Sequence, residues 1–340
     1  TPRAKPNIHM VLDDSGSMKG SSAKDVTLDG KKVERREAWN YAYKALMNKY
    51  KDKAYIGVSF LWQAYPYDSN LDPAPAGLMR LPVADYSKKT LAEIENDYDI
   101  SRLILNAPGG TPMYPGVYEA IKMFRGQPVT ARGVNSSNVD LKNYEINGEK
   151  KEFYPAISQK SPVRFRCQQN HMIVMTDGLP NRSRVWGIDM SDGLTAYSSV
   201  NKKRQYVVGN VNLSAYADIS TGFISKNPDE KDNHINILGK IAADTDLRNY
   251  QKSVNDEAGK PWFTDEYAKA MPIYMHTVSL AVDPKSPIYV GLTSAINKAN
   301  NKEHSGMNLG FEKGKGNAED LLLAFDTIVS SIILSTSSTL

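Results

Sequence analysis

The sequence predicts an α/β fold in which helices cover both faces of a central, mostly parallel sheet. Short, continuously apolar runs alternate along the chain with longer segments whose apolar residues recur at helical spacing. Such alternation is typical of parallel strands that are buried on both sides of a sheet. Hydrophobic residues make up 41% of the 340 residues, so the chain can form a sizeable core and is not expected to be disordered.

The predicted strands are short apolar segments, and two of them end directly before an aspartate. Asn7 to Leu12 precedes Asp13, and Met172 to Thr176 precedes Asp177. In a parallel sheet, the loops that leave the carboxyl ends of the strands meet at one edge, where ligands bind. The remaining predicted strands are Tyr55 to Trp62, Ile273 to Val282 and Gly306 to Phe311.

The predicted helices lie between these strands and are indicated by apolar stripes and caps. Ser87 is the expected N-cap of one helix, since its hydroxyl can accept a bond from a backbone N–H. The final helix carries a stripe with spacings of four, three and four, formed by Leu321, Phe325, Ile328 and Ile332. The other predicted helices are Lys32 to Tyr50, Ser87 to Leu103, Pro112 to Phe124, Ile235 to Asp244 and Val290 to Asn300.

Two long polar stretches interrupt the alternation, at residues 126–164 and 181–233. Loops of that length are uncommon unless they are functional, internally structured or disordered, so we interpret both as insertions beside the predicted site, with short hairpins of their own. We expect residues 1–334 to form one domain that includes both insertions. The Ser- and Thr-rich residues 335–340 are expected to be a linker towards a C-terminal domain that this sequence does not include.

Charge and composition argue against two classes of partner. The net charge is +4, with acidic and basic residues interspersed, which is not the footprint of a nucleic-acid-binding protein. The apolar run near the end of the chain carries Asp320 and Asp326 and is too short and too polar to span a bilayer. We therefore expect neither nucleic-acid binding nor direct membrane insertion.

Cysteine and histidine give no sign of a thiol or imidazole metal site. Cys167 is the only cysteine, so no disulfide can form within the chain. We expect it to be a small core residue; the alternatives are a partner cysteine in a missing segment and a reactive surface thiol. His9 and His171 lie on or beside predicted strands, where packing in the core is a better interpretation than metal ligation.

The loop after the first predicted strand has the pattern of an oxygen-ligand metal site. Asp13, Ser15 and Ser17 are spaced two apart, and a turn directly after a strand can present their oxygens to one point. Gly16 permits the tight backbone that such a turn requires. Donors that are all oxygen suit a hard cation such as Mg²⁺, Mn²⁺ or Ca²⁺. The competing interpretation is a strand-to-helix turn in which Asp and Ser only cap the backbone.

Two further segments favour the metal site. Thr111 follows two glycines and precedes a predicted helix, and Asp177 follows a buried strand. All three loops are predicted to reach the same edge of the sheet. Two carboxylates and three hydroxyls leave a divalent cation only just neutralised, so such an ion favours a carboxylate from outside as a further ligand.

This ordered pattern, DxSxS, then a Thr in a GGT loop, then an Asp at an apolar TDG strand end, resembles the von Willebrand factor A family. The resemblance runs from Asn7 to about Leu334, apart from the two insertions. It implies a Rossmann-like fold and a metal-ion-dependent adhesion site with one divalent cation, Mg²⁺ before Mn²⁺ or Ca²⁺. No ligand position departs from the family pattern, whose residues here are Asp13, Ser15, Ser17, Thr111 and Asp177.

A narrower resemblance rests on Arg166 to His171 leading into Met172 to Gly178, which is similar to the amino-terminal domain of PilY/PilC-type adhesins at the tips of bacterial type IV pili. It implies secretion to the cell surface, attachment and pilus biogenesis. The implied partners are minor pilins, a C-terminal propeller domain and a protein or surface ligand that offers a carboxylate.

Two other functions compete with adhesion. A metal-dependent hydrolase or phosphoryl-transfer enzyme with Asp13 as nucleophile would carry a second acid two residues later, where this chain has Ser15. The segment Gly16 to Gly20 also does not match the G-x-S-x-G elbow of serine hydrolases. We therefore expect no enzymatic activity. The second alternative keeps the fold but makes the chain an intracellular A domain that serves an ATPase or chelatase complex.

Overall fold

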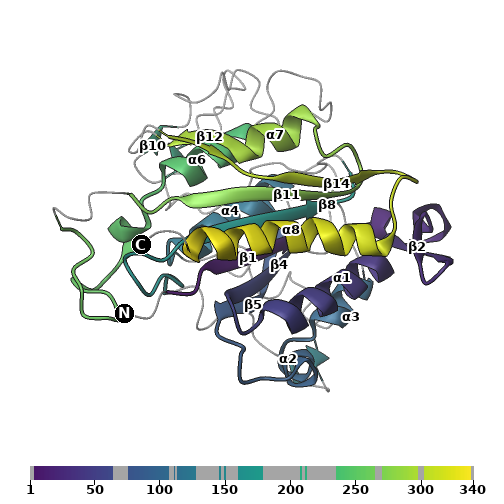
Figure 1. Cartoon of the computed structure of the whole chain (residues 1–340), viewed down its shortest axis with the longest axis horizontal. Coiled ribbons are helices and arrows are strands. Elements are labelled where there is room, and N and C mark those ends of the chain that lie inside the picture. The colour runs from purple at the N-terminus through teal and green to yellow at the C-terminus, as the bar shows by residue number, and fades with distance from the viewer. Residues whose placement is uncertain are drawn as a thin grey trace.

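A six-stranded sheet forms the centre of the computed structural model (Figure 1). The structure describes residues 4–63, 76–106, 111, 113–127, 145–146, 149–150, 160–178, 207–208, 211–212, 235–264, 270–297 and 302–337. The sheet has the order β14-β11-β8-β1-β4-β5, which is the doubly wound order of a Rossmann-like fold when its strands are numbered along the chain.

Five of these strands are parallel: β1 (Asn7–Leu12), β4 (Tyr55–Gln63), β8 (Asn170–Thr176), β11 (Ile273–Ala281) and β14 (Asn308–Glu312). The predicted α/β class with a mostly parallel sheet is thereby confirmed. The exception is β5 (Ala76–Ala84), which pairs antiparallel with β4 at the edge of the sheet and was not predicted.

The register of the two central strands determines where their loops emerge. Asn7 in β1 pairs with Asn170 in β8, and Leu12 pairs with Met175. Every residue of both strands is buried, as their apolar sequences require. Because the two strands are parallel and end together, the loops that follow them begin side by side at the carboxyl edge of the sheet.

Helices cover the sheet on both faces. On one face, α1 (Arg35–Tyr50) packs against the C-terminal helix α8 (Ala318–Ser337), where the rings of Trp39 and Phe325 lie 4.4 Å apart between centroids. On the other face, α4 (Met113–Phe124) lies beside α6 (Ile235–Asp244) (Figure 1). The predicted stripe of α8 is the face that the sheet and α1 bury.

The predicted helix from Ser87 to Leu103 is two helices, and its cap was assigned wrongly. α2 (Leu91–Tyr98) begins after Thr90, whose hydroxyl accepts the Glu93 N–H at 3.2 Å. α3 (Ile100–Asn106) follows a break at Asp99, which adopts a left-handed conformation with φ of 58°. Left-handed backbone ends a helix, and Asp is one of the few non-glycine residues that tolerate it.

Two other helices also differ from their predicted bounds. The helix predicted from Val290 to Asn300 stops early: α7 spans Pro287–Thr293, and β12 (Ser294–Asn297) then pairs with β13 (Lys302–Ser305). α1 starts at Arg35 instead of Lys32 because β2 (Val26–Leu28) and β3 (Lys31–Val33) form a hairpin before it. The connecting segments include the short 3-10 helices η1 (Gly16–Met18), η2 (Ser21–Ala23) and η6 (Leu247–Tyr250).

Most residues of the two predicted insertions lie outside the described residues. Within them, β6 (Glu145–Ile146) pairs with β7 (Glu149–Lys150), and β9 (Val207–Val208) pairs with β10 (Val211–Asn212). These described pairs are short antiparallel hairpins that do not join the central sheet. At the other end of the domain, α8 continues to Ser337 and so includes the first residues of the predicted linker.

The expectation that Cys167 packs in the core was wrong. Its side chain is exposed because it lies in the turn that precedes β8 and not on the strand itself. His9 and His171 are buried, as expected for residues on central strands. Within the described part of the chain, no helix is both long enough and apolar enough to cross a membrane.

Candidate metal centre

The loop after β1 folds back on the carboxylate that begins it. Asp13 Oδ1 accepts the backbone N–H of Ser15 at 2.8 Å, and the backbone N–H of Met18 bonds to the Ser15 carbonyl at 3.0 Å. Gly16 begins the tight turn of η1 between them. The side chains of Asp13 and Ser15 are buried, whereas Ser17 is at the surface. The metal-ligand candidates of this loop therefore range from buried, at Asp13 and Ser15, to exposed, at Ser17.

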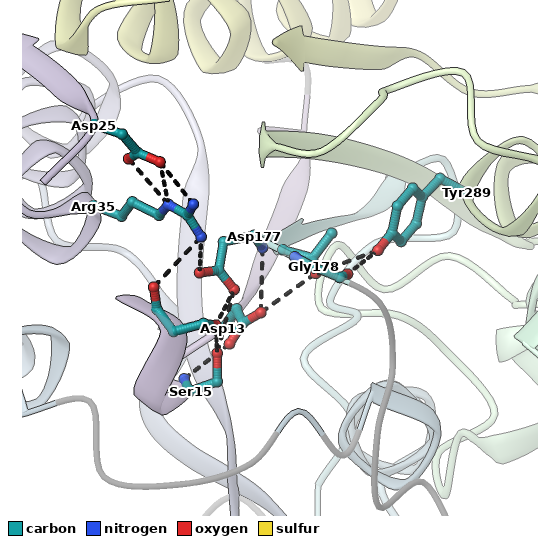
Figure 2. Close-up of polar contacts among 9 residues, drawn as sticks. Asp13, Ser15, Asp25, Arg35, Asp177, Gly178 and Tyr289 are labelled. Atoms are coloured by element: carbon teal, nitrogen blue, oxygen red, sulfur yellow. Dashed lines mark hydrogen bonds and ion pairs between the residues drawn. The ribbon is translucent and has the colours of Figure 1, made fainter. Parts of the chain in front are cut away.

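Three oxygen atoms from two loops lie close together at this edge of the sheet. Ser15 Oγ lies 2.8 Å from Ser17 Oγ and 3.3 Å from Asp177 Oδ1. Ser17 Oγ donates to the same Asp177 oxygen at 2.9 Å. Figure 2 shows Asp13, Ser15 and Asp177 facing one another. The structure thus brings together four of the five residues that the sequence singles out.

Asp13 and Asp177 place two carboxylates side by side in a buried setting. Asp13 Oδ2 accepts the backbone N–H of Asp177 at 3.3 Å and lies 3.3 Å from the hydroxyl oxygen of Thr176. Burial, together with the neighbouring Asp177 carboxylate, raises the pKa of Asp13 well above its usual range. Two ionised carboxylates at this distance repel each other, and a cation between them would offset that repulsion.

Thr111 lies two residues before Met113, the first residue of α4, and its side chain is buried. Its carbonyl accepts the backbone N–H of Met113 at 2.8 Å, which holds it at the start of the helix. The two preceding glycines lie outside the described residues. The place of Thr111 in the ligand set stays a prediction.

The donor set fits a small, hard cation. In an octahedron with oxygens about 2.1 Å from Mg²⁺, neighbouring oxygens are about 3.0 Å apart. The three contacts among Ser15, Ser17 and Asp177 span 2.8 to 3.3 Å, close to that spacing. Among the described residues, no three His, Cys, Asp or Glu side chains gather around one point, so a metal here would depend on the serine hydroxyls.

Sequence reasoning missed Arg35 and Asp25, which lie beside the predicted ligands (Figure 2). Arg35 Nη1 donates to Asp177 Oδ2 at 3.1 Å, and its Nε and Nη2 atoms donate to the Asp25 carboxylate at 2.7 to 3.2 Å. The available signal was the position of Arg35 one turn before Trp39, on the apolar face of α1. A guanidinium on such a face is buried and requires a carboxylate partner.

Tyr289 from α7 supports the other side of the site. Its hydroxyl donates to the carbonyl of Gly178, and the hydroxyl of Thr176 donates to the same carbonyl at 2.9 Å. Burial raises the pKa of Tyr289, so the phenol stays a donor at neutral pH. The turn that carries Asp177 is therefore braced from a third element, as Figure 2 shows for Tyr289 and Gly178.

No protein-family model and no curated protein matches the chain. Among solved structures, it is similar to a variant of the PilB minor pilin from Streptococcus sanguinis, with a TM-score of 0.44, 11% identity and coverage of 98% of this chain and 63% of that one. The chain therefore spans less than two thirds of that pilin's length.

Two further similar structures are a von Willebrand factor domain and a byssus protein. The first belongs to the type V pilus tip protein Mfa5 from Porphyromonas gingivalis, with a TM-score of 0.37, 13% identity and coverage of 99% of this chain and 97% of that one. The second is proximal thread matrix protein 1 from the mussel byssus, with a zinc-occupied MIDAS motif, a TM-score of 0.37, 9% identity and coverage of 97% and 48%.

Proposed function

We propose that this chain is a metal-dependent adhesion domain that binds a ligand and catalyses no reaction. Its ligand residues would hold one divalent cation, to which a carboxylate of the partner would bind. The observation that carries the proposal is the cluster of Ser15, Ser17 and Asp177 oxygens beside buried Asp13. The proposed ligands are Asp13, Ser15, Ser17, Thr111 and Asp177.

Each side chain has a distinct part in this proposal. Asp13 contributes charge and, through its bond from the Ser15 N–H, fixes the shape of the loop. Ser15 and Ser17 contribute neutral oxygens, which leave more of the cation's charge unbalanced than carboxylates would. Mg²⁺ is the favoured ion, with Mn²⁺ or Ca²⁺ as alternatives. When bound, the cation supplies the positive charge that attracts a partner carboxylate.

The arrangement around Asp13 supports binding over catalysis. Where a phosphoryl-transfer enzyme with an aspartate nucleophile would carry its general acid, Ser15 directs a hydroxyl at Ser17 and Asp177. Asp13 itself is bonded to two backbone N–H groups, from Ser15 and Asp177, which suits an orienting ligand better than an attacking group.

We further propose that the domain belongs to a PilY/PilC-type adhesin, secreted and displayed at the tip of a type IV pilus. The support is the sequence resemblance from Arg166 to Gly178. In this setting the domain takes part in surface attachment and pilus biogenesis. Its partners are minor pilins, a C-terminal propeller domain and a surface ligand that offers a carboxylate.

The direct test is metal binding by the Asp13→Ala variant, measured by calorimetry with Mg²⁺ and with Mn²⁺. We expect binding to be lost, because the change removes a full charge and the bonds that shape the loop. Asp52→Ala is the matched control, since it removes an exposed carboxylate beyond the far end of α1. Unchanged affinity in a folded Asp13→Ala protein would contradict the proposal.

A further inference from the structure

We propose that Arg35 and Asp25 set the strength with which the site holds its cation: Arg35 weakens cation binding, and Asp25 limits that effect. This inference rests on the proposed metal site. It concerns two residues outside the ligand set, one at the start of α1 and the other in the segment between η2 and β2. Neither is expected to contact the metal.

The guanidinium of Arg35 bridges two carboxylates with its two edges. Nη1 donates to Asp177 Oδ2 at 3.1 Å, while Nε and Nη2 bond to both oxygens of Asp25, the shortest contact being 2.7 Å. Nη1 also reaches the carbonyl of Ser17 at 3.4 Å. Arg35 thus contacts two of the three loops that carry proposed ligands, those of Ser17 and Asp177.

This bridge divides the two oxygens of Asp177 between two tasks. Oδ1 faces the hydroxyls of Ser15 and Ser17, at 3.3 and 2.9 Å, and Oδ2 faces Arg35. Only Oδ1 is therefore presented to a cation among the serine oxygens. The Asp177 side chain has no exposed surface, so bulk water screens its interaction with Arg35 weakly.

The position of Arg35 is set by the backbone around it. It is the first residue of α1, directly after Glu34, whose capping box with Glu37 fixes the start of the helix. The Glu34 carboxylate also accepts the backbone N–H of Gly20 at 2.9 Å, which ties the helix start to the segment that follows the metal loop. A rigid helix start holds the charge of Arg35 at a constant distance from Asp177.

The order of the charges determines the sign of the effect. Arg35 lies between Asp177 and Asp25, so its positive charge is nearer to a cation at the site than the negative charge of Asp25 is (Figure 2). The guanidinium of Arg35, like every arginine side chain in a protein, carries a permanent positive charge. A nearby positive charge repels the cation, and a negative charge behind it offsets part of that repulsion.

The consequence is a cation whose charge is less fully balanced by the protein. Arg35 partly neutralises Asp177, which is one of only two charged ligands proposed. A cation held in this way retains more attraction for a carboxylate from outside. Arg35 would therefore lower the affinity of the protein alone for the metal, and Asp25 would limit that loss. The metal-loaded site would in turn attract a partner carboxylate more strongly.

The test measures Mg²⁺ affinity by calorimetry, without any partner, in Arg35→Gln, Asp25→Asn and the double variant. We expect Arg35→Gln to bind Mg²⁺ about ten-fold more tightly and Asp25→Asn about three-fold more weakly, because the two remove charges of opposite sign and Asp25 lies farther from the site. The double variant should bind Mg²⁺ more tightly than the unmodified protein but less tightly than Arg35→Gln. A purely structural role would instead lower the affinity in both single variants.

Effects of the same sign in the two single variants, or no effect in either, would overturn the inference. If Arg35→Gln does not fold, Asp25→Asn is compared with Asp25→Glu, which keeps the charge: weaker binding in Asp25→Asn alone supports the inference, and unchanged binding in Asp25→Asn or equally weakened binding in both overturns it. Asp13→Ala distinguishes a failure of the proposed metal site from a failure of the proposed effect of Arg35 and Asp25. If Asp13→Ala loses Mg²⁺ while the Arg35 and Asp25 variants do not change it, only this inference fails; if Asp13→Ala still binds, the metal site itself is wrong.

Discussion

At the scale of single residues, different side chains supply the charge of the candidate site and the spacing of its oxygens. Asp13 and Asp177 supply the negative charge, and the hydroxyls of Ser15 and Ser17 supply oxygens at the spacing of a small cation's ligands. Arg35 then moderates the charge of Asp177 from the opposite side. A site built in this way depends on hydroxyl groups that contribute little to the stability of the fold.

Thr111 provides the test of that dependence. Thr111→Ala is expected to lower Mg²⁺ affinity about ten-fold, because it removes one neutral donor from a site with few strong ones. Its effect on the free energy of unfolding should be smaller, about 1 kcal/mol or less. Thr111→Ser, which keeps the hydroxyl, is the control, and calorimetry with thermal unfolding measures both quantities. Equal affinities in the two variants would remove Thr111 from the ligand set.

At the scale of elements, the adjacent strands β8 and β11 carry a buried histidine pair. The backbone N–H of Met307 donates to His276 Nδ1 at 3.1 Å, so the proton of neutral His276 is on Nε2 and points at His171 Nδ1, 3.0 Å away. His171 Nε2 then donates to Gln169 Oε1 at 3.0 Å. A second proton on either ring would leave two N–H groups facing each other or facing Met307.

This pair predicts a loss of stability in acid. Burial lowers the pKa of His276 from 6.5 to about 4, so the unfolded chain takes up the proton first as pH falls. The stabilising contribution is present above about pH 6.5 and decreases from there towards pH 4, by about 2 kcal/mol between pH 7 and pH 5. Denaturant unfolding at both pH values should show a smaller pH dependence in His276→Gln than in the unmodified protein. The same dependence in both would contradict this.

The packing of α1 against α8 gives a second prediction at this scale. Phe325 is fully buried against Trp39, so Phe325→Ala should lower the free energy of unfolding by about 3 to 5 kcal/mol. Leu323 is on the same helix but 60% exposed, and Leu323→Ala should change stability by about 0.5 kcal/mol or less. Chemical denaturation distinguishes the two. Similar losses would mean that α8 does not pack as described.

At the scale of the whole molecule, the site lies where parallel strands end together. Asp13 and Asp177 follow β1 and β8, and α1 and α7 add Arg35 and Tyr289 from either side. Since these groups belong to loops and helix ends around a rigid sheet, removing the cation should alter the edge of the molecule and leave its core intact.

Chelation therefore distinguishes an adhesive ion from a purely structural one. EDTA is expected to abolish attachment of intact pili, or binding of the partner, at a temperature where the domain stays folded, and added Mg²⁺ should restore it. Pili that carry Asp13→Ala should show the low level of attachment with or without EDTA. A lower melting temperature with unchanged attachment at low temperature would instead make the ion a brace for the loops and assign adhesion to another domain.

The sequence by itself determined the central strands and the C-terminal helix, and it predicted the four side chains that the structure brings together, Asp13, Ser15, Ser17 and Asp177. These features are local: a mostly apolar run such as β1 signals burial on both faces, and the spacing from Asp13 to Ser17 describes a turn without reference to the rest of the chain. The bounds of α6 also agree, since its whole pattern lies within one segment.

Only the tertiary structure decided which distant groups meet. Arg35 and Asp177 are 142 positions apart, and nothing in the sequence near either one specifies the other. The antiparallel edge strand β5 and the exposed turn of Cys167 depend in the same way on where the chain turns and what covers it. Local sequence patterns indicate that a residue is buried or that the chain must bend. They do not indicate which residue will be its partner. The charge of a buried arginine must be balanced by a carboxylate, and the packing of the whole sheet and its helices decides which carboxylate is near.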